Sequence, residues 1–450
     1  MNWLKLLSPH RFGDKPGVEI DQANRSRFEQ DYDRLIFSHP FRKLQDKTQV
    51  FPLPEDDFVH TRLTHSLEVS SVGRSLGKEV GAGILEKHPE LKSAGYTTHD
   101  FGGIVAAASL AHDLGNPPFG HSGETAISSF YTDNDLGRSF ENKVRPAEWT
   151  DLTSFEGNAQ GFRILNDEMN GGLKLTFACL GAFTKYPRLS SGKPEEGRKS
   201  HNKYGIYAGN MAEYDALATK MQLTNFNEGV WARHPLAFLV EAADDICYGI
   251  IDLEDGCRLG LVSFEQTCDL LGKIIGENFK PEKLEKIPGQ NSKLGLLRAM
   301  AIHTLVQECV TLFLAEEEHI LNAEFDQALT EVIPSRNILA EISELSVNKI
   351  YRSKQVLERE AGGFEVIGKL MEAFTMAAYN KYFDQNALSP KQKSVFRLLP
   401  EEPQIKLSRP DLTVYACCQI IGDFISSLTD SYAIKLYRIV FGFSLPTARG

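Results

Sequence analysis

The chain has 450 residues, 42% of them apolar, and a formal net charge of −11 at pH 7. This length and apolar content are enough for a sizeable buried core, and the acidic balance excludes a protein whose whole surface attracts polyanions. The seven cysteines include no C-x-x-C pair, so we interpret them as reduced core residues of a cytosolic protein.

A first helix is predicted to begin near residue 60. Apolar residues recur at helical spacing over residues 69–80, and Arg62 and His65 lie three positions apart in the opening turn. Their side chains therefore project from one face of that turn. The imidazole can hold a metal ion there while the guanidinium holds an anion.

A second helix is predicted over residues 104–111, an apolar run that ends at Gly115, so His112 and Asp113 fall in its last turn. Residues 112–124 hold two imidazoles and two carboxylates around a turn with two prolines and three glycines. Burying so many titratable groups costs folding free energy unless a metal ion or a substrate compensates their charge. A first-row divalent cation takes about four to six ligands, so the His-Asp pair requires donors from elsewhere in the chain.

A third helix is predicted to include residues 241–252, with its buried side supplied by apolar residues between 236 and 247. Asp244, Tyr248 and Asp252 follow one another at intervals of four. Each such step rises about 6 Å and rotates about 40° from alignment. The three side chains therefore form a polar stripe along this helix.

Two stretches are predicted to be rich in loops, residues 131–160 and 187–206. The second stretch carries five basic residues, Arg188, Lys193, Arg198, Lys199 and Lys203. Such a loop could close over an anionic ligand as a lid, and the alternative is a mobile surface loop without a role. We favour the lid.

The remaining pattern is helical as well. Helical periods continue over residues 299–313, the acidic residues 316–318 are interpreted as a solvated face, and strand-like alternation is scarce. We predict an all-α fold, with a unit over residues 1–270 that holds the titratable motifs and a C-terminal helical region, residues 271–450, packed on it. No apolar run reaches about 18 residues and the first ten residues are too short for a signal peptide, so we expect no membrane segment.

Taken together, these motifs resemble a known family. The succession of His65, His112-Asp113 and Asp244 is similar to the H…HD…D signature of the HD superfamily of metal-dependent phosphohydrolases. More narrowly, five ordered segments resemble the deoxyguanosinetriphosphate triphosphohydrolase (dGTPase) family: residues 41–51, 60–69, 114–121, 155–161 and 241–246. A further similar segment covers residues 422–433. A bare His-Asp pair is a weak signal, whereas five ordered motifs are a specific one.

The resemblance implies an HD-domain helical core and hydrolysis at the α-phosphorus of a deoxynucleoside triphosphate, dGTP above all, to the deoxynucleoside and tripolyphosphate. It assigns one divalent metal ion, Mn²⁺ or Mg²⁺ with other first-row metals as alternatives, to His65, His112, Asp113 and Asp244. Such chemistry must neutralise the triphosphate, orient a water and protonate the departing 5′ oxygen. The residue types suit each of these tasks.

The resemblance also assigns groups that act on the phosphates and the leaving group. His121 and Glu124 resemble the family's catalytic histidine and acid. A histidine that titrates near neutral pH can donate a proton to the leaving group while the acid fixes its tautomer. Arg62, Lys185 and Lys203 resemble phosphate-contacting positions.

Sugar contacts follow from the same resemblance. Tyr248 and Asp252 resemble residues that pack on the deoxyribose and accept its 3′-hydroxyl, with Gln49 as a third contact. A tyrosine packed against C2′ leaves no room for the 2′-hydroxyl of a ribonucleotide. The chain departs from the family at Asn116, where many HD relatives carry another histidine, and at Ser431, where an arginine is common. The departure at Asn116 bears on a third catalytic imidazole, and the departure at Ser431 lies in the segment on which base recognition draws, so the sequence does not identify the preferred base.

Members of the family assemble as oligomers, commonly hexamers, and some bind single-stranded DNA or a nucleotide as an effector. We therefore expect a homo-hexamer that acts on a dNTP in the cytoplasm. Two alternatives remain open. An HD-type nucleotide phosphatase or phosphodiesterase would not need the sugar stripe, and a non-catalytic nucleotide sensor would be favoured by loss of a metal ligand or of the His121 and Glu124 pair, all of which are present.

Overall fold

The computed structural model describes residues 1–15, 25–50, 60–167 and 173–443, and the regular structure in these ranges is almost entirely helical. The strands among these residues are a short antiparallel pair, β1 (Asn225–Asn227) and β2 (Val230–Trp231). The predicted all-α fold is confirmed. Phe51, the last residue of one motif, lies outside the described residues.

The described helices of the first 260 residues are α1 (Trp3–Leu6), α2 (Arg27–Ile36), α3 (His39–Lys43), α4 (Arg62–Lys87), α5 (Pro89–Ser93), α6 (Thr98–Ala111), α7 (His121–Asp133), α8 (Asp135–Arg138), α9 (Pro146–Thr153), α10 (Gly157–Asn166), α11 (Phe177–Phe183), α12 (Met211–Met221) and α13 (Ala237–Arg258). The later ones are α14 (Phe264–Ile275), α15 (Pro281–Glu285), α16 (Gln290–Ala315), α17 (Glu317–Leu321), α18 (Arg336–Ser346), the π-helical turn η7 (Val347–Tyr351), α19 (Lys354–Phe383), α20 (Pro390–Phe396), α21 (Glu401–Leu407), α22 (Val414–Ser426) and α23 (Asp430–Phe441). The three helices predicted from periodicity are α4, α6 and α13.

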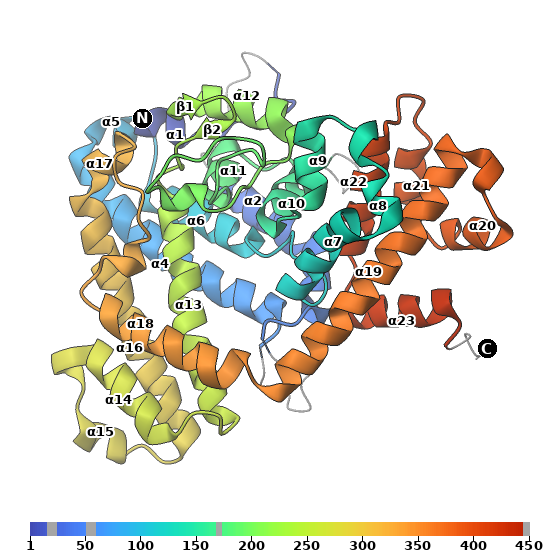
Figure 1. Ribbon diagram of the computed structural model, residues 1–450. Helices are drawn as coiled ribbons and strands as arrows, with labels where there is room; N and C mark the ends of the chain where they lie inside the picture. Colours follow the sequence, from blue (N-terminus) through green and yellow to red (C-terminus); the bar gives the residue numbers. More distant parts are fainter. Residues whose placement is uncertain (16–24, 51–59, 168–172, 444–450) are drawn as a thin grey trace.

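The helices pack around two hydrophobic cores. The larger core unites residues of α4, α6, α13 and α16 with neighbouring helices, and the smaller one unites α7 with α19, α20, α22 and α23. Figure 1 shows α20–α23 gathered at one end of the molecule and α14–α16 at another, with α4, α6 and α13 between them. The smaller core draws on residues from both predicted regions of the chain, and the division at residue 270 stays a prediction.

Close packing of α4 on α6 brings the first two motifs together. Gly73, Gly77 and Gly81 recur every fourth residue along α4, on the side that faces α6. A β-carbon at Gly77 would lie 2.7 Å from the carbonyl oxygen of Phe101 in α6, closer than real contacts permit. The absence of side chains at these positions lets the two helix backbones approach, as small residues generally do.

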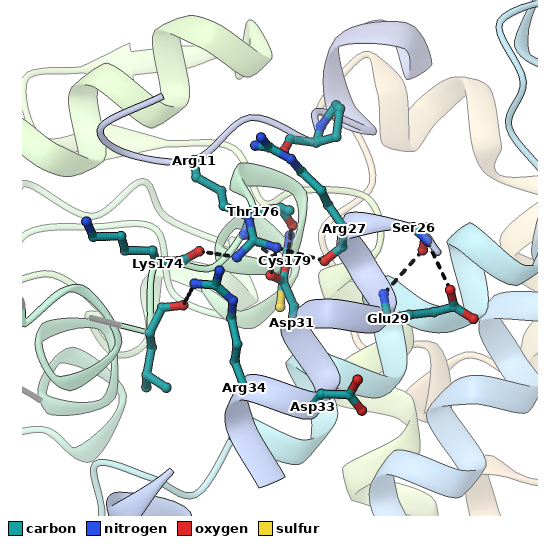
Figure 2. Close-up of polar contacts among 12 residues, drawn as sticks. Arg11, Ser26, Arg27, Glu29, Asp31, Asp33, Arg34, Lys174, Thr176 and Cys179 are labelled. Atoms are coloured by element: carbon teal, nitrogen blue, oxygen red, sulfur yellow. Dashed lines mark hydrogen bonds and ion pairs between the residues drawn. The ribbon is translucent and has the colours of Figure 1, made fainter. Parts of the chain in front are cut away.

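A buried polar cluster fastens the N-terminal segment to α2 and α11 (Figure 2). The guanidinium of Arg11 pairs with Asp31 at 2.8 Å and donates to the carbonyl oxygen of Lys174 at 2.6 Å. Asp31 also accepts hydrogen bonds from the backbone N–H and the hydroxyl of Thr176, at 2.8 and 2.6 Å. Burial raises the pKa of Asp31 to about 6, against the opposing effect of Arg11.

Two expectations drawn from local sequence were wrong. Residues 131–160 are not rich in loops, because they contain α8, α9 and the start of α10. The acidic residues 316–318 are not simply a solvated face, because the carboxylate of Glu317 is buried and accepts hydrogen bonds from Trp3, Lys87 and His88. By contrast, residues 187–206 are mostly irregular, as predicted.

Helix α16 is long and apolar enough, by length and composition alone, to cross a membrane. This is weak evidence, since core helices of soluble proteins pass the same test. In this structure α16 packs against α4, α13 and α14, and its residues belong to the larger core.

Candidate active site

Four side chains from three segments meet at the junction of the two cores. His65 lies in the first turns of α4, His112 and Asp113 follow α6, and Asp244 lies in α13. The Nε2 atoms of His65 and His112 lie 3.2 and 3.5 Å from Oδ1 of Asp244. Ligand atoms of His65, His112 and Asp113 all lie within 4.8 Å of one another. The structure thus brings the four predicted metal ligands together.

The donor set fits a divalent cation. His112 directs Nδ1 at the carbonyl oxygen of Ser109, 2.7 Å away, so that nitrogen carries the proton and Nε2 keeps its lone pair for a ligand. Oδ2 of Asp113 is buried and has no hydrogen-bond donor among the described residues. A buried carboxylate oxygen without a partner costs folding free energy unless a cation binds it. Two imidazole nitrogens and two carboxylates are a normal ligand mix for first-row divalent metals.

Neighbouring side chains orient Asp113. Its Oδ1 pairs with Nη1 of Arg62 at 2.9 Å and accepts a hydrogen bond from the amide of Asn116. Burial opposes the charged form of Asp113, but Arg62 and the nearby histidines outweigh it and lower the pKa of the carboxyl. Asn116, where many HD relatives carry a histidine, therefore holds the side chain of a predicted metal ligand.

His121 and Glu124 form a pair in the first turn of α7. Nδ1 of His121 lies 2.8 Å from Oε2 of Glu124, and Oε1 of Glu124 accepts the backbone N–H of Gly157 at 2.8 Å. The hydrogen bond to Glu124 is the main cause that raises the pKa of His121. The other ring nitrogen, Nε2, belongs to a side chain that is 84% exposed, so it is free to meet a ligand.

An aromatic cavity of about 440 Å³ opens on one side of the cluster. Gln49 lines it, and the Oε1 atom of this residue is buried without a hydrogen-bond donor among the described residues. Tyr248 stacks on Tyr351, with ring centroids 5.4 Å apart. Asp252 is 3% exposed and is not among the described residues that line this cavity. Its carboxylate accepts a hydrogen bond of 2.7 Å from the hydroxyl of Tyr351. Burial raises the pKa of Asp252 to about 7, against the effect of that hydroxyl.

A polar cavity of about 270 Å³ opens on the other side of the cluster. Lys185 lies in it 3.6 Å from Glu241, and Lys203 lies 3.5 Å from Glu156. The backbone at Lys203 is held by Arg188, whose Nε donates to the Lys203 carbonyl oxygen. Both cavities are lined by Arg62, His112, Asp113, His121 and Asp244. The cluster of predicted metal ligands therefore lies between the two cavities.

The charges around the polar cavity do not balance. Among the described residues that line it, five carboxylates face three cationic side chains, an excess of two negative charges with the histidines neutral. A polyanion would be repelled by such a surface, because like charges raise its energy. A divalent cation would cancel the excess, which is a second reason why the residues fit a metal ion.

Some lining residues come from the C-terminal third of the chain, and no sequence motif predicted them. Tyr351, Arg359 and Glu360 line the aromatic cavity, and Ser122 of α7 donates to the carbonyl oxygen of Glu360 at 2.6 Å. These residues lie in η7 and in the first turns of α19, more than 200 residues after the His-Asp pair. No local pattern distinguishes them from other helix residues.

Two family models match separate parts of the chain. One described as an HD domain matches residues 62–149, which include His65, His112 and Asp113 as well as the pair on α7. One described as a phosphohydrolase-associated domain matches residues 333–439, which supply Tyr351 and Arg359 to the aromatic cavity. The two matched parts thus meet at the candidate site.

Curated relatives match over nearly the whole chain. A deoxyguanosinetriphosphate triphosphohydrolase-like protein of Synechocystis sp. is 41% identical, and one of Pseudomonas aeruginosa is 38% identical, each over 99% of this chain and 100% of the relative. A deoxyguanosinetriphosphate triphosphohydrolase of Salmonella typhi is 29% identical over 97% of both chains. The chain belongs to the deoxyguanosinetriphosphate triphosphohydrolase family of the HD-domain phosphohydrolases.

Proposed function

We propose that the protein hydrolyses deoxynucleoside triphosphates, dGTP foremost, to the deoxynucleoside and tripolyphosphate in a metal-dependent reaction. The observation that carries this proposal is the meeting of His65, His112, Asp113 and Asp244 between an aromatic and a polar cavity. A nucleoside suits the first cavity and a triphosphate suits the lysines of the second. The names of the relatives agree with this substrate class.

His65, His112, Asp113 and Asp244 would hold one divalent cation, Mn²⁺ or Mg²⁺. When bound, such a cation supplies Lewis-acid polarisation of the α-phosphate and favours deprotonation of water. Arg62 would exchange its present contact with Asp113 for a phosphate oxygen, because a guanidinium offers a planar fork of donors. Lys185 and Lys203, now paired with carboxylates, would contact the remaining phosphates.

His121 would act as the general acid. Water attacks the α-phosphorus and releases a proton to solvent, the bond between phosphorus and the 5′ oxygen breaks with its electron pair on that oxygen, and Nε2 of His121 gives its proton to the oxygen. Glu124 holds Nδ1 and raises the pKa of the imidazole, so the ring stays protonated to higher pH. Positioned proton transfer of this kind contributes a factor on the order of 10²–10⁴ in rate.

The aromatic cavity would hold the nucleoside. Tyr248 would pack on the deoxyribose and exclude a 2′-hydroxyl, while the open Oε1 of Gln49 would accept a hydrogen bond from the sugar. Asp252 would act on the 3′-hydroxyl directly or through Tyr351, whose hydroxyl already binds it. From the resemblance alone we further propose a homo-hexamer with single-stranded DNA or a nucleotide as effector. The cysteine pattern supports a cytoplasmic location, and the basic residues of 187–206 support a lid formed by that stretch.

The test is to incubate the purified protein with each dNTP and Mn²⁺ or Mg²⁺ and to separate the products by ion-exchange chromatography. We expect tripolyphosphate and the deoxynucleoside, and we expect a chelator to abolish the reaction until the metal is restored. Release of pyrophosphate or orthophosphate would refute the cleavage position. Undiminished turnover after exhaustive chelation would refute the metal requirement.

A further inference from the structure

The turn that leads into α7 has an uncommon backbone. Phe119 and Gly120 both have positive φ, 63° and 59°, and His121 follows directly as the first residue of the helix. A residue with a β-carbon rarely adopts this conformation, so Phe119 must be held there by its surroundings. Gly120, the N-cap of α7, offers no side chain to hold the helix start. The position of the His121 imidazole therefore depends on contacts made to this turn from outside.

Asp430, the first residue of α23, makes such a contact. The residue is 1% exposed, and Oδ1 of its side chain accepts the backbone N–H of Phe119 at 3.0 Å. Oδ2 accepts the backbone N–H of Thr48, the residue before Gln49, at 2.9 Å and also pairs with Arg359 of α19. One buried carboxylate thus ties together the turn before His121, the Gln49 segment and two C-terminal helices.

Lys47 holds the other end of the same turn. Its buried ammonium donates to the carbonyl oxygen of Asn116 at 2.6 Å and to that of Ser426, at the end of α22, at 2.8 Å. The turn from Asn116 to Phe119 is therefore fixed at both ends by charged side chains that also bind the α22–α23 pair. Hydrogen bonds from charged groups are stronger than those between neutral groups and restrict geometry accordingly.

We propose that Asp430 is a positioning residue for the reaction: by binding the N–H of Phe119 it keeps the His121 imidazole where it can protonate the leaving group. The inference rests on the proposed function, in which His121 is the general acid. Asp430 does not line either cavity among the described residues, so it acts on the reaction through the turn and not by contact with substrate. A displacement of about 1 Å in a catalytic group can cost a factor on the order of 10² in rate.

The experiment is a double-mutant cycle with Asp430→Asn and His121→Ala, measuring kcat for dGTP hydrolysis. Asp430→Asn keeps the size of the side chain, but it has a single oxygen for the two N–H groups of Phe119 and Thr48 and no charge for Arg359. We expect kcat of Asp430→Asn to fall by a factor on the order of 10–10². In the background of His121→Ala the same change should have no further effect, because residues that act through one another are not additive.

Asp31→Asn is the matched control. Asp31 is also a buried carboxylate bound by an arginine and a backbone N–H, but it lies in the cluster of Figure 2 and lines neither cavity. We expect it to lower the melting temperature and to leave kcat unchanged in both backgrounds. If the role of Asp430 were purely structural, Asp430→Asn would likewise lower the melting temperature and leave kcat unchanged.

Three outcomes overturn the inference: unchanged kcat in Asp430→Asn, equal losses in the two backgrounds, or unfolding of both Asp430→Asn and Lys47→Met. If Asp430→Asn alone fails to fold, the double-mutant cycle with His121→Ala is repeated with Lys47→Met, which removes the contact at the other end of the turn. A wild-type protein that releases no tripolyphosphate would instead refute the proposed function, so the two failures are distinguishable.

Discussion

Replacement of Glu124 by glutamine tests the proposed general acid most directly. Glu124 accepts from Gly157 through one oxygen and binds Nδ1 of His121 through the other, both at 2.8 Å. Glutamine keeps the size of the side chain and an oxygen for Gly157. It presents a neutral amide to the imidazole, however, so the protonated ring loses its charged partner. The pKa of His121 should therefore fall in the variant.

The size of the effect follows from the exposure of the imidazole. A hydrogen bond to a charged group contributes roughly 1.5–3 kcal/mol when it is shielded from water. The side chain of His121 is 84% exposed, so solvent screens the pair and we take a lower value of about 1.4 kcal/mol. That value corresponds to a loss of kcat that approaches about tenfold at pH values above the pKa of the wild-type ring and vanishes at low pH, where both rings are protonated.

The sign of the pH dependence is fixed by the role of the proton. Glu124 raises the pKa of His121, and the protonated form is the active one, so kcat of the wild type should fall as pH rises through that raised value. In Glu124→Gln the fall should begin at lower pH, while kcat at low pH changes little. The assay is kcat for dGTP across the pH range, with fixed Mn²⁺.

A matched control exists on the surface. Glu316 binds Nδ1 of His319 at the same 2.8 Å and with the same three-residue spacing, next to α17. Glu316→Gln should leave the profile unchanged. If Glu124→Gln lowers kcat equally at every pH, or leaves the alkaline limb unmoved, the assignment of His121 as the proton donor is refuted.

Two further predictions concern specificity and stability. Tyr248→Ala should raise kcat/KM for GTP relative to dGTP about tenfold or more, because the ring that excludes a 2′-hydroxyl is gone; an unchanged ratio would remove Tyr248 from sugar selection. His60→Gln should lower the melting temperature at pH 6 by an amount equivalent to a few kcal/mol, since the ring of His60 is held 2.6 Å from Asp255 and 3.2 Å from Glu68. These partners, against the effect of burial, raise the pKa of His60 to about 10. The stabilisation is fully present below the unfolded pKa of about 6.5 and is lost as pH rises through the folded value, so the gap between wild type and variant should close toward pH 10 in thermal melts. A gap that is constant with pH would contradict this reasoning.

The charge pattern of the site predicts that the binding of metal and of substrate depend on each other. Among the described residues that line the polar cavity, negative side chains exceed positive ones by two, and the three cationic groups are engaged with carboxylates. A triphosphate can bind there only if cations offset those carboxylates. Metal binding is therefore expected to precede tight substrate binding.

Local sequence was sufficient for the parts of the fold that depend on neighbours along the chain. The periodicity of residues 69–80 and 104–111 predicted α4 and α6, and the spacing within residues 241–252 predicted α13. These predictions succeed because helical spacing and capping act within a few turns. The ordered motifs also predicted the family, and the four metal ligands that they imply lie together.

The tertiary structure alone decided which distant residues complete the site. Tyr351 and Arg359 line the aromatic cavity, and Asp430 binds the turn before His121, although each lies at least 230 residues further along the chain. Glu317 looked like a solvated acid in its own helix, but it is buried and accepts a hydrogen bond from the indole of Trp3. Such contacts arise where the two cores meet, and their geometry depends on how whole helices pack, which no local pattern encodes.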